Sequence, residues 1–204
     1  MTTTAEPTTL SPIDLDARDA LFTSARTINT FAETPVTDQE LVDVWDLARW
    51  APTAANFQPL RVTFVRTSQR KRQLASLMSD GNRAKTAIAP VVAILSADHG
   101  FYEHLPTVAP FRAELADVFA ANPEMAASAA TNNSWLQAGY FILAVRAMGL
   151  AAGPMGGFDA AAIDAEFLDE GRHALLVVNI GHPGEGAWRD RLPRLDHSDL
   201  ISWE

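Results

Sequence analysis

The segment Val91-Val92-Ala93-Ile94-Leu95-Ser96-Ala97 decides the fold class of this chain. Six of its seven side chains are apolar, and helical patterns lie on both sides of it in the sequence. A continuous apolar run of this length is typical of a strand that is buried on both faces. His173 to Ile180 (HALLVVNI) is a second such run. The sequence therefore predicts a central sheet whose two faces are covered by helices.

A helix with clear start and stop signals is predicted between residues 37 and 50. Thr37 stands three residues before Glu40, which is the spacing of a capping box. An apolar stripe at helical spacing follows, made of Leu41, Val44, Trp45 and Ala48. Pro52 disfavours helical geometry at Ala51, so this helix should end near Trp50.

The rest of the chain alternates few strands with many helices. Residues 61–66 (RVTFVR) have the composition of a strand. Residues 131–148 are apolar on nearly every side, so this helix must be buried on several faces, either centrally or at a subunit interface. Residues 153–159 (GPMGGFD) are predicted as a tight turn. Helices are also predicted at 13–25 and 69–78, and an irregular or helical excursion at 99–125. This order predicts an α+β sandwich with a central sheet.

Length and composition exclude several classes of protein. A chain of 204 residues without a visible linker predicts a single domain at 13–204, after a disordered leader at 1–12. The net charge of −9 argues against a nucleic-acid or anionic-membrane partner, so an anionic ligand needs a local cationic pocket. The chain has no cysteine, no signal-peptide pattern and no apolar run of about 18 residues. We therefore expect a cytoplasmic protein with no membrane partner.

The loop at residues 51–59 (APTAANFQP) is neutral and amide-rich. Prolines stand near both of its ends, and between them lie three side chains that form hydrogen bonds, Thr53, Asn56 and Gln58. A stiff, uncharged loop of this kind suits a flat polar heterocycle. A rigid helix-to-strand turn that binds nothing is the alternative.

Two segments offer groups for an anionic or heterocyclic ligand. Arg26, Thr27 and Asn29 supply a cation, a hydroxyl and an amide within four residues, which suits a phosphate dianion. Asn82 and Lys85 are three residues apart and should share one face of a helical turn, where both can touch one heterocycle. The alternatives are a helix C-terminus with a dipole-favoured arginine and a solvated turn.

Two later segments add a backbone contact and more positive charge. The Gly156-Gly157 pair lets main chain approach a ligand ring without a side chain in the way. Arg189 and Arg191 point to the same side of an extended tail and together can hold a phosphate. A plain helix-to-helix turn and a solvated tail are the alternatives.

No metal site is predicted, because none of the five histidines pairs with another at metal-ligand spacing and no carboxylate cluster accompanies them. The sequence also lacks the GxSxG, Walker and GxGxxG motifs, so the hydrolase and dinucleotide-binding classes lack their signatures.

Taken in order, these segments resemble the nitroreductase family of FMN-dependent NAD(P)H oxidoreductases, from about Leu21 to Pro193. The loop 51–59 is similar to the family's AP-S-S-x-N-x-Q-P signature, and NRAK at 82–85 resembles the Asn and Lys that face the flavin ring. GPMGGFD is similar to the turn over the flavin N5 atom, and RDRLP to the phosphate-binding tail. ART-I-N, FYEHLP and NNSWLQAGY resemble the malonic semialdehyde reductase subgroup in particular.

The resemblance implies an α+β fold with a central mixed or antiparallel sheet flanked by helices, in a domain-intertwined homodimer with FMN at the interface. It implies ping-pong hydride transfer from NAD(P)H through flavin N5 to a small acceptor, such as malonic semialdehyde or a nitro compound, with no catalytic side chain assigned. The cofactor-binding residues that it implies are Arg26, Thr27, Asn29, Pro52, Thr53, Ala54, Asn56, Asn82, Lys85, Pro154, Met155, Gly156, Gly157, Arg189 and Arg191.

Three positions depart from the family pattern. Asn29 stands where a cation is usual, Ala54 lacks the hydroxyl of the second serine, and Gly156 stands where many members have Glu. Two alternatives remain open beside the enzyme: a flavin-binding or flavin-cleaving relative without hydride turnover, and an interaction protein that binds no flavin.

Overall fold

The computed structural model describes residues 10–204 and contains one four-stranded sheet. The strands are β1 (Leu60–Val65), β2 (Val91–Asp98), β3 (Ala151–Met155) and β4 (Arg172–Gly181), in the spatial order β1-β2-β4-β3. All three pairings are antiparallel. The predicted α+β class and the antiparallel sheet are confirmed, and the two apolar runs are the two central strands.

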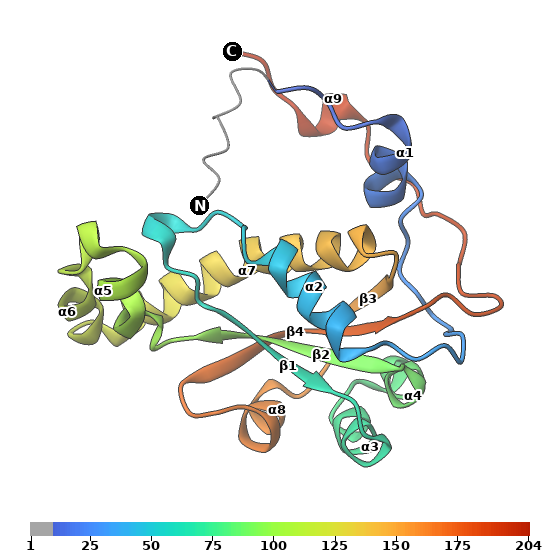
Figure 1. Ribbon diagram of the computed structural model, residues 1–204, viewed down its shortest axis with the longest axis horizontal. Helices are drawn as coiled ribbons and strands as arrows, with labels where there is room; N and C mark the ends of the chain where they lie inside the picture. Colours follow the sequence, from blue (N-terminus) through green and yellow to red (C-terminus); the bar gives the residue numbers. More distant parts are fainter. Residues whose placement is uncertain (1–9) are drawn as a thin grey trace.

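Helices cover both faces of this sheet, as Figure 1 shows. On one face lie α2 (Asp38–Ala48) and the long α7 (Pro123–Ala147), and on the other α3 (Ser68–Ser76), α4 (Asp80–Ile88) and α8 (Ala160–Phe167). Side chains of β2 alternate between the two layers. Val91, Ala93 and Leu95 belong to the core under α2 and α7, whereas Val92 and Ile94 pack with α3 and α8. This arrangement confirms the double burial of the apolar run.

The start of α2 follows the sequence closely. The hydroxyl of Thr37 accepts from the Glu40 amide, while the Glu40 carboxylate accepts from the Thr37 amide 2.7 Å away, so the capping box is complete. Leu41, Val44 and Ala48 of the predicted stripe are buried. The helix ends at Ala48, two residues before the position predicted from Pro52.

The predicted start of the long apolar helix is wrong by eight residues. The prediction placed it at 131 and left Pro123 in the irregular or helical excursion at 99–125, but α7 begins at Pro123. A proline at the first helical position has no intrahelical donor to lose, and its fixed φ suits the helix. Pro123 therefore starts α7.

The predicted turn at 153–159 is also partly wrong, because Gly153, Pro154 and Met155 lie in strand β3. This strand pairs only with β4 and forms one edge of the sheet. A proline is tolerated in an edge strand when the N–H that it lacks would point away from the neighbouring strand. The turn itself is confined to the residues between Met155 and Asp159, whose carboxylate caps α8 by accepting from the Ala162 amide.

The excursion at 99–125 is a series of short helical turns, η3 (Phe101–His104), α5 (Leu105–Val108), η4 (Pro110–Arg112) and α6 (Leu115–Ala120). The terminal segments, with α1 (Leu15–Arg18), η1 (Asp19–Thr23) and α9 (His197–Leu200), reach away from the sheet (Figure 1). Most of the expected leader, residues 1–9, lies outside the described residues, and residues 10–12 are exposed and in no helix or strand. No helix in the described part of the chain is long and apolar enough to cross a membrane.

Candidate functional site

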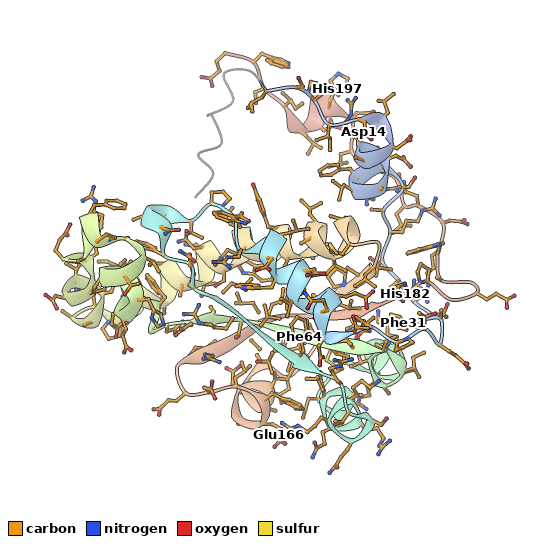
Figure 2. The ribbon with its side chains drawn as sticks, in the orientation of Figure 1. Asp14, Phe31, Phe64, Glu166, His182 and His197 are labelled. Atoms are coloured by element: carbon orange, nitrogen blue, oxygen red, sulfur yellow. The ribbon has the colours of Figure 1, made fainter. Side chains whose placement is uncertain are left out.

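The segment before α2 and the tail after β4 run side by side, although more than 150 residues separate them in sequence. The Ile28 amide donates to the carbonyl of Ala152 in β3 at 3.3 Å, and the Asn29 amide donates to the Ala187 carbonyl at 3.1 Å. The Ala32 amide donates to the His182 carbonyl at 3.0 Å, and Figure 2 shows Phe31 beside His182 at the end of β4. Edge strand β3 thus aligns the two segments that carry the predicted arginines.

These segments enclose a cavity of about 310 Å³. Its lining includes all five predicted phosphate-binding residues, Arg26, Thr27, Asn29, Arg189 and Arg191. The Arg26 guanidinium donates to the Arg189 carbonyl at 3.2 Å, and that of Arg191 donates to the Ala25 carbonyl at 3.2 Å. The Asn29 side chain donates to the Thr27 carbonyl at 3.2 Å, so its amide nitrogen is already used within the segment.

The cavity is strongly cationic in a chain whose net charge is −9. Arg26, Arg189 and Arg191 face one lining carboxylate, that of Asp190, and none of the three forms an ion pair within residues 10–204. Asp19 also lies near Arg191: hydrogen bonds from Ser24 and Thr23, with a contribution from that arginine, hold the pKa of Asp19 below its usual value. Concentrated, unpaired guanidinium charge of this kind suits a phosphate.

Lys85 in α4 adds a further cation next to this cavity. Burial, and then the positive charge of Arg189, lower the pKa of Lys85 below the ordinary lysine value. One turn earlier in the same helix, the Asn82 side chain donates to the carbonyl of Gly157 at 3.2 Å. The predicted pair therefore links the cationic cavity to the turn that follows β3.

The two glycines of that turn have different surroundings. A Cβ added at Gly156 would meet no heavy atom within 4 Å, so its backbone borders open space. A Cβ at Gly157 would lie 2.8 Å from the Ser79 hydroxyl oxygen and 3.1 Å from the Asn82 side-chain nitrogen. Gly156 is therefore the residue whose main chain is open to a ligand, whereas Gly157 is small because α4 and its N-cap pack against it.

The neutral loop 51–59 lies elsewhere. It contains the turn η2 (Ala54–Asn56), whose Ala54 amide donates to Asn133 Oδ1 of α7 at 2.7 Å. The cationic cavity lies near the other end of α7, where Arg146 donates to the Leu21 carbonyl and its pKa is lowered by burial and then by Arg191. The thirteen residue-to-residue steps from Asn133 to Arg146 along the helix correspond to about 20 Å. Pro52, Thr53, Ala54 and Asn56 are thus not gathered with the arginines within one chain.

Asn56, predicted to contact a ligand through its amide, is already engaged in the protein. Its side-chain nitrogen donates to the Val108 carbonyl of α5 at 2.7 Å. This bond joins the loop to the 99–125 excursion. The amide that the sequence presents as a ligand contact therefore also fixes the loop.

The structure also places residues that sequence reasoning missed. Arg194 lines the cationic cavity, although in a fully extended tail it would point away from Arg189 and Arg191. Asn133 and Gln137 are buried polar residues in the most apolar helix, and both bond the loop 51–59 or its exit. The sequence feature that could have identified Asn133 and Gln137 is their spacing of four residues, which places both polar side chains on one face of the helix.

The histidines form no metal centre within residues 10–204, where no group of three or more potential ligands is placed to hold an ion. The rings of His99 and His173 instead lie against each other with centroids 4.2 Å apart and planes tilted by 32°, and His173 Nδ1 lies 3.0 Å from Asp164 Oδ2.

Known proteins that are similar to this chain identify its family. The model of the nitroreductase family matches residues 23–182, which include most of the site. The chain belongs to the nitroreductase family. A Streptomyces coelicolor protein provisionally named NADH dehydrogenase/NAD(P)H nitroreductase is 54% identical over 195 residues, covering 95% of this chain and 96% of the relative. A protein of the same provisional name from Leptothrix cholodnii is 48% identical over 185 residues, covering 90% of this chain and 94% of the relative.

Solved structures of nitroreductases share the fold at low sequence identity. A provisionally named nitroreductase from Exiguobacterium sibiricum, solved in complex with FMN, superposes with a TM-score of 0.81 at 18% identity, covering 97% of this chain and all of that one. A nitroreductase family protein from Streptococcus pneumoniae gives a TM-score of 0.79 at 20% identity, covering 93% and 99% of the two chains. The nitroreductase fold predicted from the motifs is therefore confirmed.

The two glycines of this nitroreductase turn should respond differently to substitution. Gly156→Ala should leave the thermal midpoint unchanged, because the new Cβ meets open space. Gly157→Ala should destabilise the fold by about 1 kcal/mol, the lower end of the overpacking range, because the Ser79 hydroxyl can rotate away. Thermal unfolding monitored by circular dichroism measures both. Equal midpoints for the two variants would contradict the assignment of their surroundings.

Proposed function

We propose that this nitroreductase-family chain is an FMN-dependent NAD(P)H oxidoreductase. The observation that carries the proposal is the cationic cavity of Arg26, Arg189 and Arg191, whose Arg189 acts on Lys85 in α4, the helix that bonds the turn after β3 through Asn82. The names of the Streptomyces and Leptothrix relatives and the FMN in the Exiguobacterium structure support it. When bound, FMN would accept a hydride from NAD(P)H and pass the reducing equivalents to a small acceptor.

The residues present fit this group. Three guanidinium groups with the Thr27 hydroxyl form a donor set for the phosphate, and Asn29, whose side chain bonds the Thr27 carbonyl, shapes the same lining. Asn82, Lys85 and the Gly156 main chain would face the ring, with Pro154, Met155 and Gly157 supporting that turn. No dinucleotide loop is present in the sequence, so a mononucleotide is favoured over a dinucleotide.

The chain's own contribution is to bind, orient and neutralise charge. The ammonium of Lys85 would stabilise negative charge that develops on the ligand ring, because it is partly buried, where charges are weakly screened. Ligand negative charge would in turn raise the lowered pKa of Lys85. We assign no side chain as an obligatory acid or base.

We further propose a homodimer in which the loop 51–59 of a second copy completes each site. The exposed face of α7 carries Trp135, Leu136 and Tyr140, which are 46%, 55% and 44% exposed at helical spacing. The terminal segments are also rich in exposed apolar side chains, including Leu195 and Trp203. An apolar stripe of this kind with apolar arms fits burial against a second copy. Pro52, Thr53, Ala54 and Asn56 would then face the flavin across the interface.

The acceptor that we propose is malonic semialdehyde, reduced to 3-hydroxypropionate, or a nitro compound, and the mechanism is ping-pong. We also propose that the protein is cytoplasmic and that residues 13–204 form one domain. Support comes from the motifs shared with malonic semialdehyde reductases and from the relatives' names. Rapid mixing of the pre-reduced, FMN-loaded protein with each acceptor ranks them by rate. Tight FMN binding without NAD(P)H oxidation would overturn the enzymatic proposal in favour of a flavin-binding relative.

Arg189→Ala tests the phosphate contact. The Arg189 side chain makes no hydrogen bond within the described residues, so its removal should leave the fold intact. One charge-assisted hydrogen bond contributes about 1.5–3 kcal/mol, so FMN affinity should fall roughly ten- to a hundredfold. Quenching of FMN fluorescence on titration measures the dissociation constant. The matched control is Arg72→Ala, which removes an exposed arginine on α3 and should change nothing; equal affinities for both variants would remove Arg189 from the site.

FMN affinity should fall as pH rises through the lowered pKa of Lys85. Below that pKa the ammonium is charged and attracts the ligand, and above it the attraction is lost. For the ligand-free protein the sign is opposite: stability should rise with pH between the folded-state pKa and the ordinary lysine value, because the unfolded chain binds the extra proton there. Titrations between pH 7 and 10 measure the binding effect. Lys85→Met should flatten this dependence, and a profile unchanged by that substitution would exclude Lys85.

Leu136→Glu should disrupt the homodimer. The substitution places a charge in the centre of the exposed α7 stripe, where burial against a second copy would cost several kcal/mol. Sedimentation velocity should show a dimer for the native chain and a monomer for the variant. Val118→Glu provides the control, because Val118 is also partly exposed, at 41%, but lies on α6. A native chain that sediments as a monomer would contradict the proposed assembly.

A further inference from the structure

The loop 51–59 holds an unusual backbone conformation. Ala55, Asn56 and Gln58 all have positive φ, at 43°, 60° and 47°, and none of them is glycine. Outside this loop, every positive-φ residue within 10–204 is a glycine. Such a conformation is costly for residues with a Cβ and persists only where the surroundings enforce it.

Two buried side chains of α7 supply that enforcement. Asn133 Oδ1 accepts from the Ala54 amide at 2.7 Å, and Gln137 Oε1 accepts from the Leu60 amide at 3.0 Å. Asn133 and Gln137 are only 7% and 2% exposed, and their spacing of four residues places both on one face of the helix. The strained residues lie between these two anchors.

The first anchor is itself fixed. The Asn133 side-chain nitrogen donates to the Ala129 carbonyl one turn earlier at 2.8 Å, which orients its oxygen toward the loop. At the other end of the loop, Arg61 donates to the Gln58 carbonyl at 2.8 Å and is held by Asp98 at 2.7 Å. Both ends of the loop are thus held by hydrogen bonds to buried or part-buried side chains.

We infer that Asn133 and Gln137 are positioning residues that hold the loop 51–59 in its strained, ligand-facing form. Neither is placed at the ligand; each acts through the backbone of the loop. Without an anchor the loop relaxes into several conformations, and the ligand must then select the competent one, which raises the apparent dissociation constant by the inverse of its population. This inference rests on the proposed function for the identity of the ligand, but not for the state of the loop.

The test compares two variants of the chain. Asn133→Leu keeps the size of the side chain but removes the acceptor. Ser134→Ala is the matched control, because Ser134 is equally buried in the same helix and its hydroxyl has no partner within the described residues.

Amide hydrogen exchange, measured without added flavin, reports directly on the opening of the loop backbone. Asn133→Leu should speed exchange of the amides at residues 53–58 about three- to tenfold, the range expected for loss of one hydrogen bond. Amides of strand β2 should keep their native rates, and Ser134→Ala should match the native loop within about twofold. The dissociation constant for FMN should rise by a similar factor in Asn133→Leu alone.

If the loop amides of Asn133→Leu exchange at native rates, the inference is overturned. Equal acceleration of amide exchange in β2 would also overturn it, because Asn133 would then support the whole fold rather than the loop. If Asn133→Leu does not fold, Asn133→Ala removes the same acceptor without adding bulk. Failure of the native chain to bind FMN would refute the proposed function instead, and the exchange data would still decide the role of Asn133.

Discussion

The packing of α7 against the central strands is the constraint on which the rest of this molecule depends. One face of the helix buries Ala138, Phe141 and Val145 against the sheet. Its buried amides hold the loop 51–59, and its C-terminal end carries Arg146 beside the segment that leads into the cationic cavity. Because one rigid rod fixes both regions, their separation along the helix is set by the number of residues between them.

That geometry explains how the candidate site is divided. The cationic cavity lies near Arg146 in the last turn of α7, whereas the neutral loop is bonded to Asn133, about 20 Å away along the same helix. Although the net charge of the chain is −9, four arginine side chains line this one cavity. Their local positive charge attracts an anionic ligand, whereas the net negative charge of the rest of the chain repels it. The cationic groups and the neutral loop 51–59 therefore lie in different parts of one chain.

The sequence was most informative where local interactions decide the structure. The capping box of Thr37 and the double burial of β2 follow from short-range patterns, and both are confirmed. The two errors, at the start of α7 and in β3, both fall on segments that contain a proline, Pro123 and Pro154, and the effect of a proline depends on whether its missing N–H would have had a partner. The spacing of Asn133 and Gln137 indicated a shared helical face, but neither the hydrogen-bond partner of Asn133 nor the surroundings of Gly157 was predictable, because both depend on contacts between distant segments.

Pro154 has a further consequence for how the folded chain behaves in concentrated solution. The Ala152 carbonyl points outward from β3 and is taken by Ile28, and Pro154, two residues later, faces the same way with no hydrogen to offer. An incoming strand would find one acceptor occupied and one donor missing along this side of the sheet. Pro154 therefore makes this edge of the sheet a poor template for open-ended strand addition and aggregation.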